Sequence, residues 1–181
     1  AARRSCTPLD ADVYNSIIAL AARADQPYQA HSCLKQMAEA NIQADVVSFN
    51  LVIDAWAKRG NAEAALRLVD IMCEVGVEPD ATTMGAAINA CAKARDLRRA
   101  EAIFVKILSR GLVRPDTIAF NSLMDAASRS GNVARAEEWL KCMKMTKVLP
   151  NVVSYSTLLH AHARDGNMEA VQAGLDHMLE M

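Results

Sequence analysis

The chain repeats a pattern of about 35 residues, and this period limits the folds open to it more than any other feature of the sequence. The stretch DVVSFNLVIDAWAKRGN, which begins at Asp45, returns 106 residues later as NVVSYSTLLHAHARDGN, which begins at Asn151. Related stretches begin at Asp10, Asp80 and Asp116, so the successive spacings are 35, 35, 36 and 35 residues. A period of this length indicates one supersecondary unit that is used several times.

The period divides the chain into units that together form one domain. We predict four full units and a shorter fifth, at residues 11–45, 46–80, 81–116, 117–151 and 152–181. Residues 1–10 are predicted to be the end of a preceding unit or an N-terminal cap.

Each unit contains the signals of two helices joined by a tight turn. In the second unit, the first helix is expected at residues 47–58 and to end before Gly60, because glycine tolerates the left-handed conformation that ends helices. Asn61 is the predicted N-cap of the second helix, since its side chain can accept a hydrogen bond from a backbone N–H of the first turn. Pro79 then prevents the second helix from continuing into the next unit. Corresponding N-caps are predicted at Asp25, Asp96, Asn132 and Asn167.

The apolar positions of the units form columns, which indicate how the units pack. Equivalent positions of the first helices hold large residues that we predict to lie in the core: Tyr14, Phe49, Met84, Phe120 and Tyr155. With 4% aromatic residues, 7 Gly and 5 Pro, the composition is typical of packed helices rather than of a β-sandwich or a disordered chain. One hairpin cannot bury its apolar faces alone, but stacked hairpins can. We therefore predict an all-α fold, an α-solenoid of stacked helix-turn-helix hairpins.

Several classes of function lack the sequence patterns that they require. The net charge of −1 gives no overall basic field that would attract nucleic acid, and no apolar run is long enough for membrane insertion. We find no Cys/His cluster, no glycine-rich phosphate loop and no nucleophile at a diagnostic spacing from a base. The sequence therefore predicts no enzyme, no metal site, no cofactor and no small-molecule substrate.

The 35-residue hairpin, which opens with VVSFN and ends with VEPD in the second unit, resembles the pentatricopeptide repeat of the P type. The Trp, Leu-Gly and Tyr pattern of the related tetratricopeptide repeat is absent, and peptide binding in the manner of that family has no supporting motif. The resemblance implies a right-handed superhelix that binds single-stranded RNA along its concave face, one base per repeat. It also implies an organellar location, in a chloroplast or mitochondrion, and a role in RNA processing, stability or translation.

In the family, the fifth and last residues of a repeat read the base, and the second residue packs against the bases. Carried to this chain, the resemblance implies base-reading residues Asn15 with Asp45, Asn50 with Asp80, Asn121 with Asn151, Asp116, and Ser156. It implies base-packing residues Val47, Thr82, Ile118 and Val153. Asp116 is paired with Gly85, which has no side chain to read a base. The family's pairings imply a target of five nucleotides, roughly U-U-N-Y-R.

The residues themselves carry a second signal, because the thirteenth residue of every unit is basic. These candidate phosphate-binding residues are Arg23, Lys58, Lys93, Arg129 and Arg164. With about 3.6 residues per helical turn, the second, fifth and thirteenth positions share one face of the first helix. Stacked units would then present a stripe of cations that can follow a phosphate backbone. The alternative interpretation is that each cation complements the dipole at the end of its helix.

Other residues favour a protein partner instead of RNA. Asp54 and Asp125 lie four residues after Asn50 and Asn121 on the same predicted face, and Asp12 occupies a base-packing position. Negative charge at these places opposes RNA binding, and the net charge is close to zero. The alternative function is therefore a structural scaffold subunit of a large organellar protein or ribonucleoprotein complex.

Overall fold

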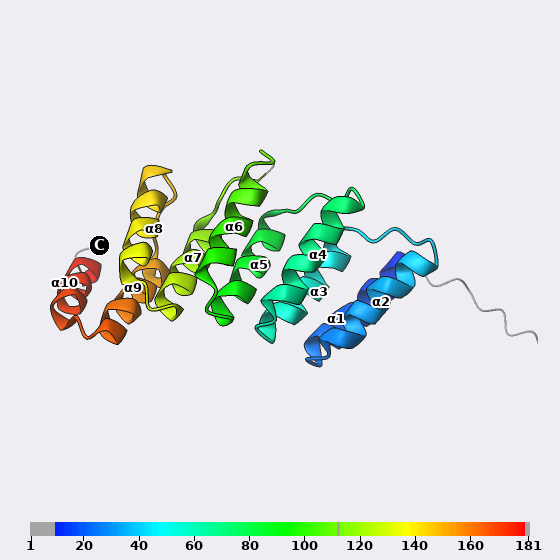
Figure 1. The fold of residues 1–181 in the computed structure, drawn as a ribbon, viewed down its shortest axis with the longest axis horizontal. Coiled ribbons are helices and arrows are strands. Elements are labelled where there is room, and N and C mark those ends of the chain that lie inside the picture. The colour runs from blue at the N-terminus through cyan, green and yellow to red at the C-terminus, as the bar shows by residue number, and fades with distance from the viewer. Residues whose placement is uncertain (1–9, 112, 180–181) are drawn as a thin grey trace, which may run out of the picture.

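The computed structural model describes residues 10–111 and 113–179, which form helices and connecting turns without a strand. The helices are α1 (Ala11–Arg23), α2 (Pro27–Glu39), α3 (Val46–Lys58), α4 (Ala62–Glu74), α5 (Ala81–Lys93), α6 (Leu97–Leu108), α7 (Thr117–Arg129), α8 (Val133–Met145), α9 (Val152–Asp165) and α10 (Met168–Leu179). Consecutive helices form hairpins that follow one another along the array from α1 to α10 (Figure 1). The predicted all-α solenoid of stacked hairpins is confirmed. Of the predicted cap at residues 1–10, all but Asp10 lies outside the described residues.

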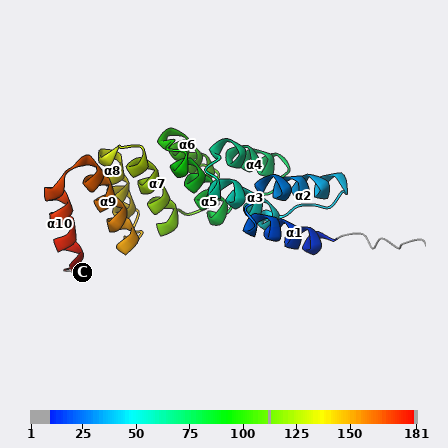
Figure 2. The same ribbon diagram turned by 90° about the horizontal axis from the view of Figure 1, so that it is seen from below.

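The helices form two layers, one of odd-numbered and one of even-numbered helices (Figure 2). Each odd-numbered helix packs against the next one, from α1 through α9. No two consecutive even-numbered helices share contacts of comparable extent within the described residues. Since the odd-numbered helices stack more closely, the array bends with their layer on the inner side.

The core lies between the two layers and follows the predicted columns. Tyr14, Phe49, Met84, Phe120 and Tyr155 are all buried, which confirms their predicted place. An aromatic cluster joins α6, α7 and α8: the ring centroid of Phe104 lies 5.7 Å from that of Phe120 and 5.4 Å from that of Trp139. This cluster is part of one core of buried side chains that runs along the array from Tyr14 to Tyr155.

The helix starts agree with the predicted caps at all positions but one. Asn61, Asp96, Asn132 and Asn167 each accept a hydrogen bond from a backbone N–H three residues later. The prediction for Asp25 was wrong, because the residue before α2 is Gln26, which makes no capping bond, and Pro27 opens the helix. Asp25 instead takes the left-handed conformation, with φ of 55°, at the place that Gly60 has in the next hairpin. Its carboxylate accepts a hydrogen bond from Arg59 Nε at 3.0 Å.

Lys147→Gly is expected to stabilise the protein. Lys147 follows the C-cap of α8 with φ of 61°, whereas the equivalent residues after α4 and α6 are Gly76 and Gly111. A left-handed conformation costs a residue with a Cβ about 1–2 kcal/mol, and the gain is partly offset by the greater flexibility of glycine in the unfolded chain. We expect the free energy of unfolding to rise by about 1 kcal/mol in urea denaturation. Thr146→Gly, one residue earlier at φ of −82°, is the control and should destabilise. A Lys147→Gly protein less stable than the parent would contradict the prediction.

Candidate nucleic-acid interface

The residues predicted to read bases lie in the odd-numbered layer, and each pair is assembled from two consecutive hairpins. Asn50 on α3 donates from Nδ2 to Oδ1 of Asp80, the N-cap of α5, at 3.1 Å. Asn121 on α7 donates in the same way to Oδ1 of Asn151, the N-cap of α9, at 3.3 Å. The structure thus brings together residues that are 30 positions apart in sequence.

Asn15, Asn50 and Asn121 also accept a hydrogen bond from a hydroxyl that was not predicted from the sequence. The three hydroxyls each donate to an asparagine Oδ1 at 2.6 Å: Ser48 to Asn15, Thr83 to Asn50 and Ser154 to Asn121. The same three residues complete capping boxes with the N-caps Asp45, Asp80 and Asn151. Their sequence signal is a Ser or Thr three positions after each of those N-caps, which is the spacing of a capping box.

The third unit lacks this arrangement. Gly85 offers no amide, and the buried residue at the hydroxyl's place is Ala119, whose backbone N–H donates to Asp116 Oδ1 at 2.8 Å. A Cβ added at Gly85 would lie 3.6 Å from Cγ2 of Ile118, an ordinary van der Waals contact. Gly85 therefore has no side-chain group that could contact a base, although the space around it admits a side chain.

The remaining predicted contacts also lie on odd-numbered helices. Ser156 on α9 donates its hydroxyl to the carbonyl of Val152 at 2.6 Å, so only its lone pairs are left for a ligand. The predicted base-packing residues Val47, Thr82, Ile118 and Val153 are exposed in the first turns of α3, α5, α7 and α9. Ile118, for example, is 66% exposed. Three of these four exposed side chains are aliphatic, and they lie beside the polar pairs.

The five basic residues lie at the other end of the odd-numbered helices, eight residues and about 12 Å along the axis from the fifth position. Lys58 pairs with Asp54 at 2.8 Å, and Arg129 pairs with Asp125 at 2.7 Å. Lys93 Nζ donates to the carbonyl of Lys58 at 3.3 Å, as expected of a cation at a helix C-terminus. The other two, Arg23 and Arg164, form no ion pair with any described residue. Asp54 and Asp125, two of the three acidic residues that oppose RNA binding, thus pair with the cations next to them.

Two of the predicted base-reading carboxyls are held in the ionised form. The backbone N–H of Ser48 is the main cause that lowers the pKa of Asp45, and burial opposes it. For Asp80 burial alone would raise the pKa, but hydrogen bonds, led by those from the Thr83 backbone N–H and the Asn50 amide, lower it. At neutral pH both residues are therefore anionic acceptors.

The lowered pKa of Asp80 predicts a loss of stability in acid. The folded state binds fewer protons than the unfolded state, so this stability is complete above the usual value of 3.8 and is lost as the pH falls through the lowered pKa. Asp80→Asn should flatten the dependence of the unfolding free energy on pH below about pH 5, measured by urea denaturation from pH 7 to pH 3. Asn151→Asp places a carboxyl in the equivalent site and should steepen it. Parallel curves for the parent and Asp80→Asn would contradict the prediction.

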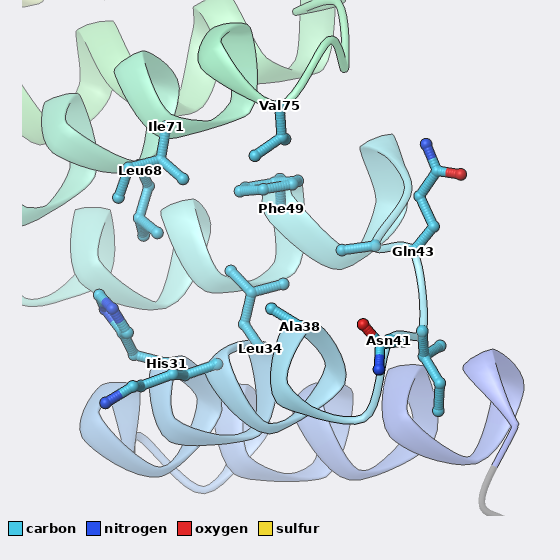
Figure 3. A pocket seen from close by; sticks show the side chains of 12 residues that line it. His31, Leu34, Ala38, Asn41, Gln43, Phe49, Leu68, Ile71 and Val75 are labelled. Carbon is cyan, nitrogen blue, oxygen red and sulfur yellow. The ribbon is translucent and has the colours of Figure 1, made fainter.

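The outer side of the array has an apolar pocket of about 540 Å³ between α2 and α4. Leu34 and Ala38 line it from α2, Leu68 and Ile71 line it from α4, and Val75 lines it from the C-cap of α4 (Figure 3). Phe49 of α3 and the loop residues from Asn41 to Ala44 complete the lining, so the pocket also reaches the odd-numbered layer (Figure 3).

Neither a metal site nor a membrane span is found in the described part of the chain. Within residues 10–111 and 113–179, no three His, Cys, Asp or Glu side chains gather as metal ligands would. None of the helices described there combines the length and apolar character needed to cross a bilayer.

The chain matches two models of one repeat family over most of its length. The model described as PPR repeat family matches residues 44–93 and 115–179, and the model described as PPR repeat matches residues 12–42 and 82–112. A pentatricopeptide repeat-containing protein of Arabidopsis thaliana is 29% identical over 137 residues, which are 76% of this chain and 16% of that protein. A second, mitochondrial one is 28% identical over 127 residues, 70% of this chain and 19% of that protein. The chain thus spans less than a fifth of each of these two relatives.

Solved structures of the same kind share the fold. The maize pentatricopeptide repeat protein PPR10, in complex with an 18-nucleotide psaJ RNA element, superposes with a TM-score of 0.81 at 22% identity, covering 98% of this chain and 29% of that one. The PPR domain of Arabidopsis thaliana protein-only RNase P 1, in complex with tRNA, gives 0.76 at 13% identity, covering 94% and 89%. At these identities the likeness establishes the fold alone. Together with the family models, which match along nearly the whole array, it leads to one assignment: the chain belongs to the pentatricopeptide-repeat family.

Proposed function

We propose that the chain binds single-stranded RNA along the layer of odd-numbered helices, with one base facing each unit. The observation that carries this proposal is the recurring polar pair on that layer, an asparagine on one odd-numbered helix bonded to the N-cap of the next. Such pairs at regular intervals suit a polymer whose bases are also regularly spaced.

The free atoms of each pair suggest which base it reads. Asp80 uses Oδ1 for internal bonds, so Oδ2 is left as an acceptor that complements the N3–H of uracil. Asn151 also uses Oδ1 internally, so Nδ2 is left as a donor that complements the N3 lone pair of cytosine. Asp45 should act as Asp80 does, and Ser156 is assigned a purine from the family resemblance. The proposed target stays U-U-N-Y-R.

The other predicted contacts complete this mode of binding. Val47, Thr82, Ile118 and Val153 would pack against the faces of the bases, and the basic residues at the far ends of the helices would contact phosphates. For Lys58 and Arg129 this contact competes with their ion pairs to Asp54 and Asp125. Exposed pairs of this kind contribute only about 0–1 kcal/mol, so a phosphate can displace the aspartate.

Similar proteins and solved structures also support the proposal. The matched structures of PPR10 and of protein-only RNase P 1 contain RNA, and one matched relative is mitochondrial. We propose that the protein works in an organelle, as a non-enzymatic adaptor in RNA processing, stability or translation.

The proposal is tested by fluorescence anisotropy with labelled single-stranded RNA. Oligonucleotides that contain UUNYR are compared with scrambled ones over a range of salt concentrations. Binding that depends on sequence and weakens as salt rises is expected. No binding at low salt by a chain with full helical circular dichroism would overturn the proposal.

The alternative function is a scaffold subunit that binds protein rather than a specific RNA. The apolar outer pocket between α2 and α4 is the observation that favours it, since an exposed apolar surface is typical of a protein-binding site. The absence of RNA binding by the folded chain would make this the leading function.

A further inference from the structure

The hydroxyls of Ser48, Thr83 and Ser154 must each find an acceptor inside the protein. All three residues are fully buried, with 0% of their surface exposed, and an unpaired buried hydroxyl is costly. The shortest bond of each hydroxyl is the one of 2.6 Å to the asparagine Oδ1 of the preceding hairpin. Its bond to the N-cap Oδ1 is longer, at 2.9 Å for Ser48 and Thr83 and 3.2 Å for Ser154. The donated hydrogen therefore goes to the asparagine.

The direction of this network is set by the backbone. The N–H of Thr83 can only donate, so the atom of Asp80 that faces it at 2.7 Å must accept. That same Oδ1 then receives Nδ2 of Asn50. Turning the amide of Asn50 over would place its Oδ1 against Oδ1 of Asp80, two acceptors face to face. The hydroxyl on the other side holds the amide oxygen, so Asn50 is anchored at both ends.

The one junction without an asparagine also lacks the hydroxyl. Gly85 replaces the asparagine in the third unit, and Ala119 replaces the hydroxyl residue of the fourth. If the hydroxyl served only the helix start, it would be equally useful after Asp116, which is an N-cap as well. The hydroxyl is present at the three junctions with a preceding asparagine and missing at the one without.

We propose that Ser48, Thr83 and Ser154 are positioning residues that determine base specificity by holding the preceding asparagine amide in one fixed position against the base. This inference rests on the proposed function. Without the hydroxyl, the amide of Asn50 keeps only its contact with the N-cap, so it can swing about that single bond and no longer holds its free atoms against the base. The unit then still holds a nucleotide through the packing and phosphate contacts but discriminates less between bases.

The first experiment compares Thr83→Val, Thr83→Ser and the parent protein. Valine keeps the shape of threonine but removes the hydroxyl. Anisotropy titrations use RNAs that carry U or C at the second base of UUNYR. We expect the preference of Thr83→Val for uracil to fall by roughly fivefold or more, since a good hydrogen-bonded pair contributes at least that much to discrimination. The salt dependence should not change, and Thr83→Ser should keep the preference.

The outcomes separate the two proposals. A parent protein that binds no RNA, or binds all bases equally, overturns the proposed function and this inference with it. A parent that prefers uracil together with a folded Thr83→Val that prefers it equally overturns only the inference. Loss of the preference in Thr83→Ser as well as in Thr83→Val would also overturn it, because serine restores the hydroxyl.

A second experiment installs the network where the chain lacks it, so that it does not depend on how well Thr83→Val folds. The double variant Gly85→Asn/Ala119→Ser should gain a uracil preference at the third base, using Asp116 as the N-cap. Gly85→Asn alone supplies the amide without its anchor, and Ala119→Ser alone supplies the anchor without the amide. We expect at least about a fivefold preference in the double variant and little in either single one. Equal preferences for Gly85→Asn and the double variant would overturn the inference.

Discussion

Replacing Phe120 by Ala is expected to lower the free energy of unfolding by about 3–5 kcal/mol, the range found when large aromatic residues are truncated in cores. Phe120 is 1% exposed, and its ring lies 5.7 Å from Phe104 and 6.3 Å from Trp139 between centroids. These rings join α6, α7 and α8, so the cavity would open where the third and fourth hairpins meet. In an array held together by contacts between neighbours, such a defect weakens the coupling between the two ends.

Urea denaturation followed by circular dichroism measures this effect. Fluorescence of variants that keep only one tryptophan follows the two ends separately, because Trp56 lies on α3 and Trp139 on α8. Val105→Ala on α6 is the control, since Val105 is 60% exposed and its truncation should change the stability by less than about 0.5 kcal/mol. A loss below about 1 kcal/mol for Phe120→Ala would show that the aromatic cluster does not hold the array together.

Replacing Lys58, Lys93 and Arg129 together by Ala is expected to weaken RNA binding by about 100-fold at about 0.1 M salt. Each lost contact with a single-stranded phosphate lowers the slope of log affinity against log salt by about 0.7, so three contacts reduce it by about 2. The variant also leaves Asp54 and Asp125 without their cations, which adds repulsion of the RNA.

A matched control removes the same charge from the even-numbered helices. Lys35, Arg67 and Lys141 are exposed on α2, α4 and α8, and their replacement by Ala changes the net charge by the same amount. If position rather than total charge matters, the control variant should bind RNA with nearly the parental affinity and salt slope. Equal losses in both variants would show that the basic residues act only through the overall field.

The fold could be predicted almost completely from the sequence because its signals are local. Glycine, proline and capping residues mark the ends of each helix, and the apolar columns show which faces pack. Asp25 was misplaced because aspartate is favoured both as an N-cap and as a rare non-glycine residue in the left-handed conformation. Only its alignment with Gly60, rather than with Asn61, distinguishes the two roles.

The candidate site could be predicted only in part. The family resemblance supplied the outward-facing residues, and helical periodicity placed the cations on a shared face. The hydroxyls of Ser48, Thr83 and Ser154 were missed because their partners are 33 residues away, and no local pattern reports a bond between consecutive hairpins. The partners of Lys58 and Arg129 follow from i, i+4 spacing, but whether they are paired depends on side-chain geometry.

The bonds across the junctions also define how such a protein can be cut and rejoined. Exchanging whole structural units, with borders before α3 or α5, would leave each asparagine with its N-cap but separate it from the hydroxyl that also binds it. The segments that keep a full set of contacts instead run from the asparagine to the hydroxyl: 15–48, 50–83 and 121–154, each with its two ends 33 residues apart. Cassettes with these borders would each carry one complete set of these contacts into a new array, whereas units cut at the helix starts would part each asparagine from its hydroxyl.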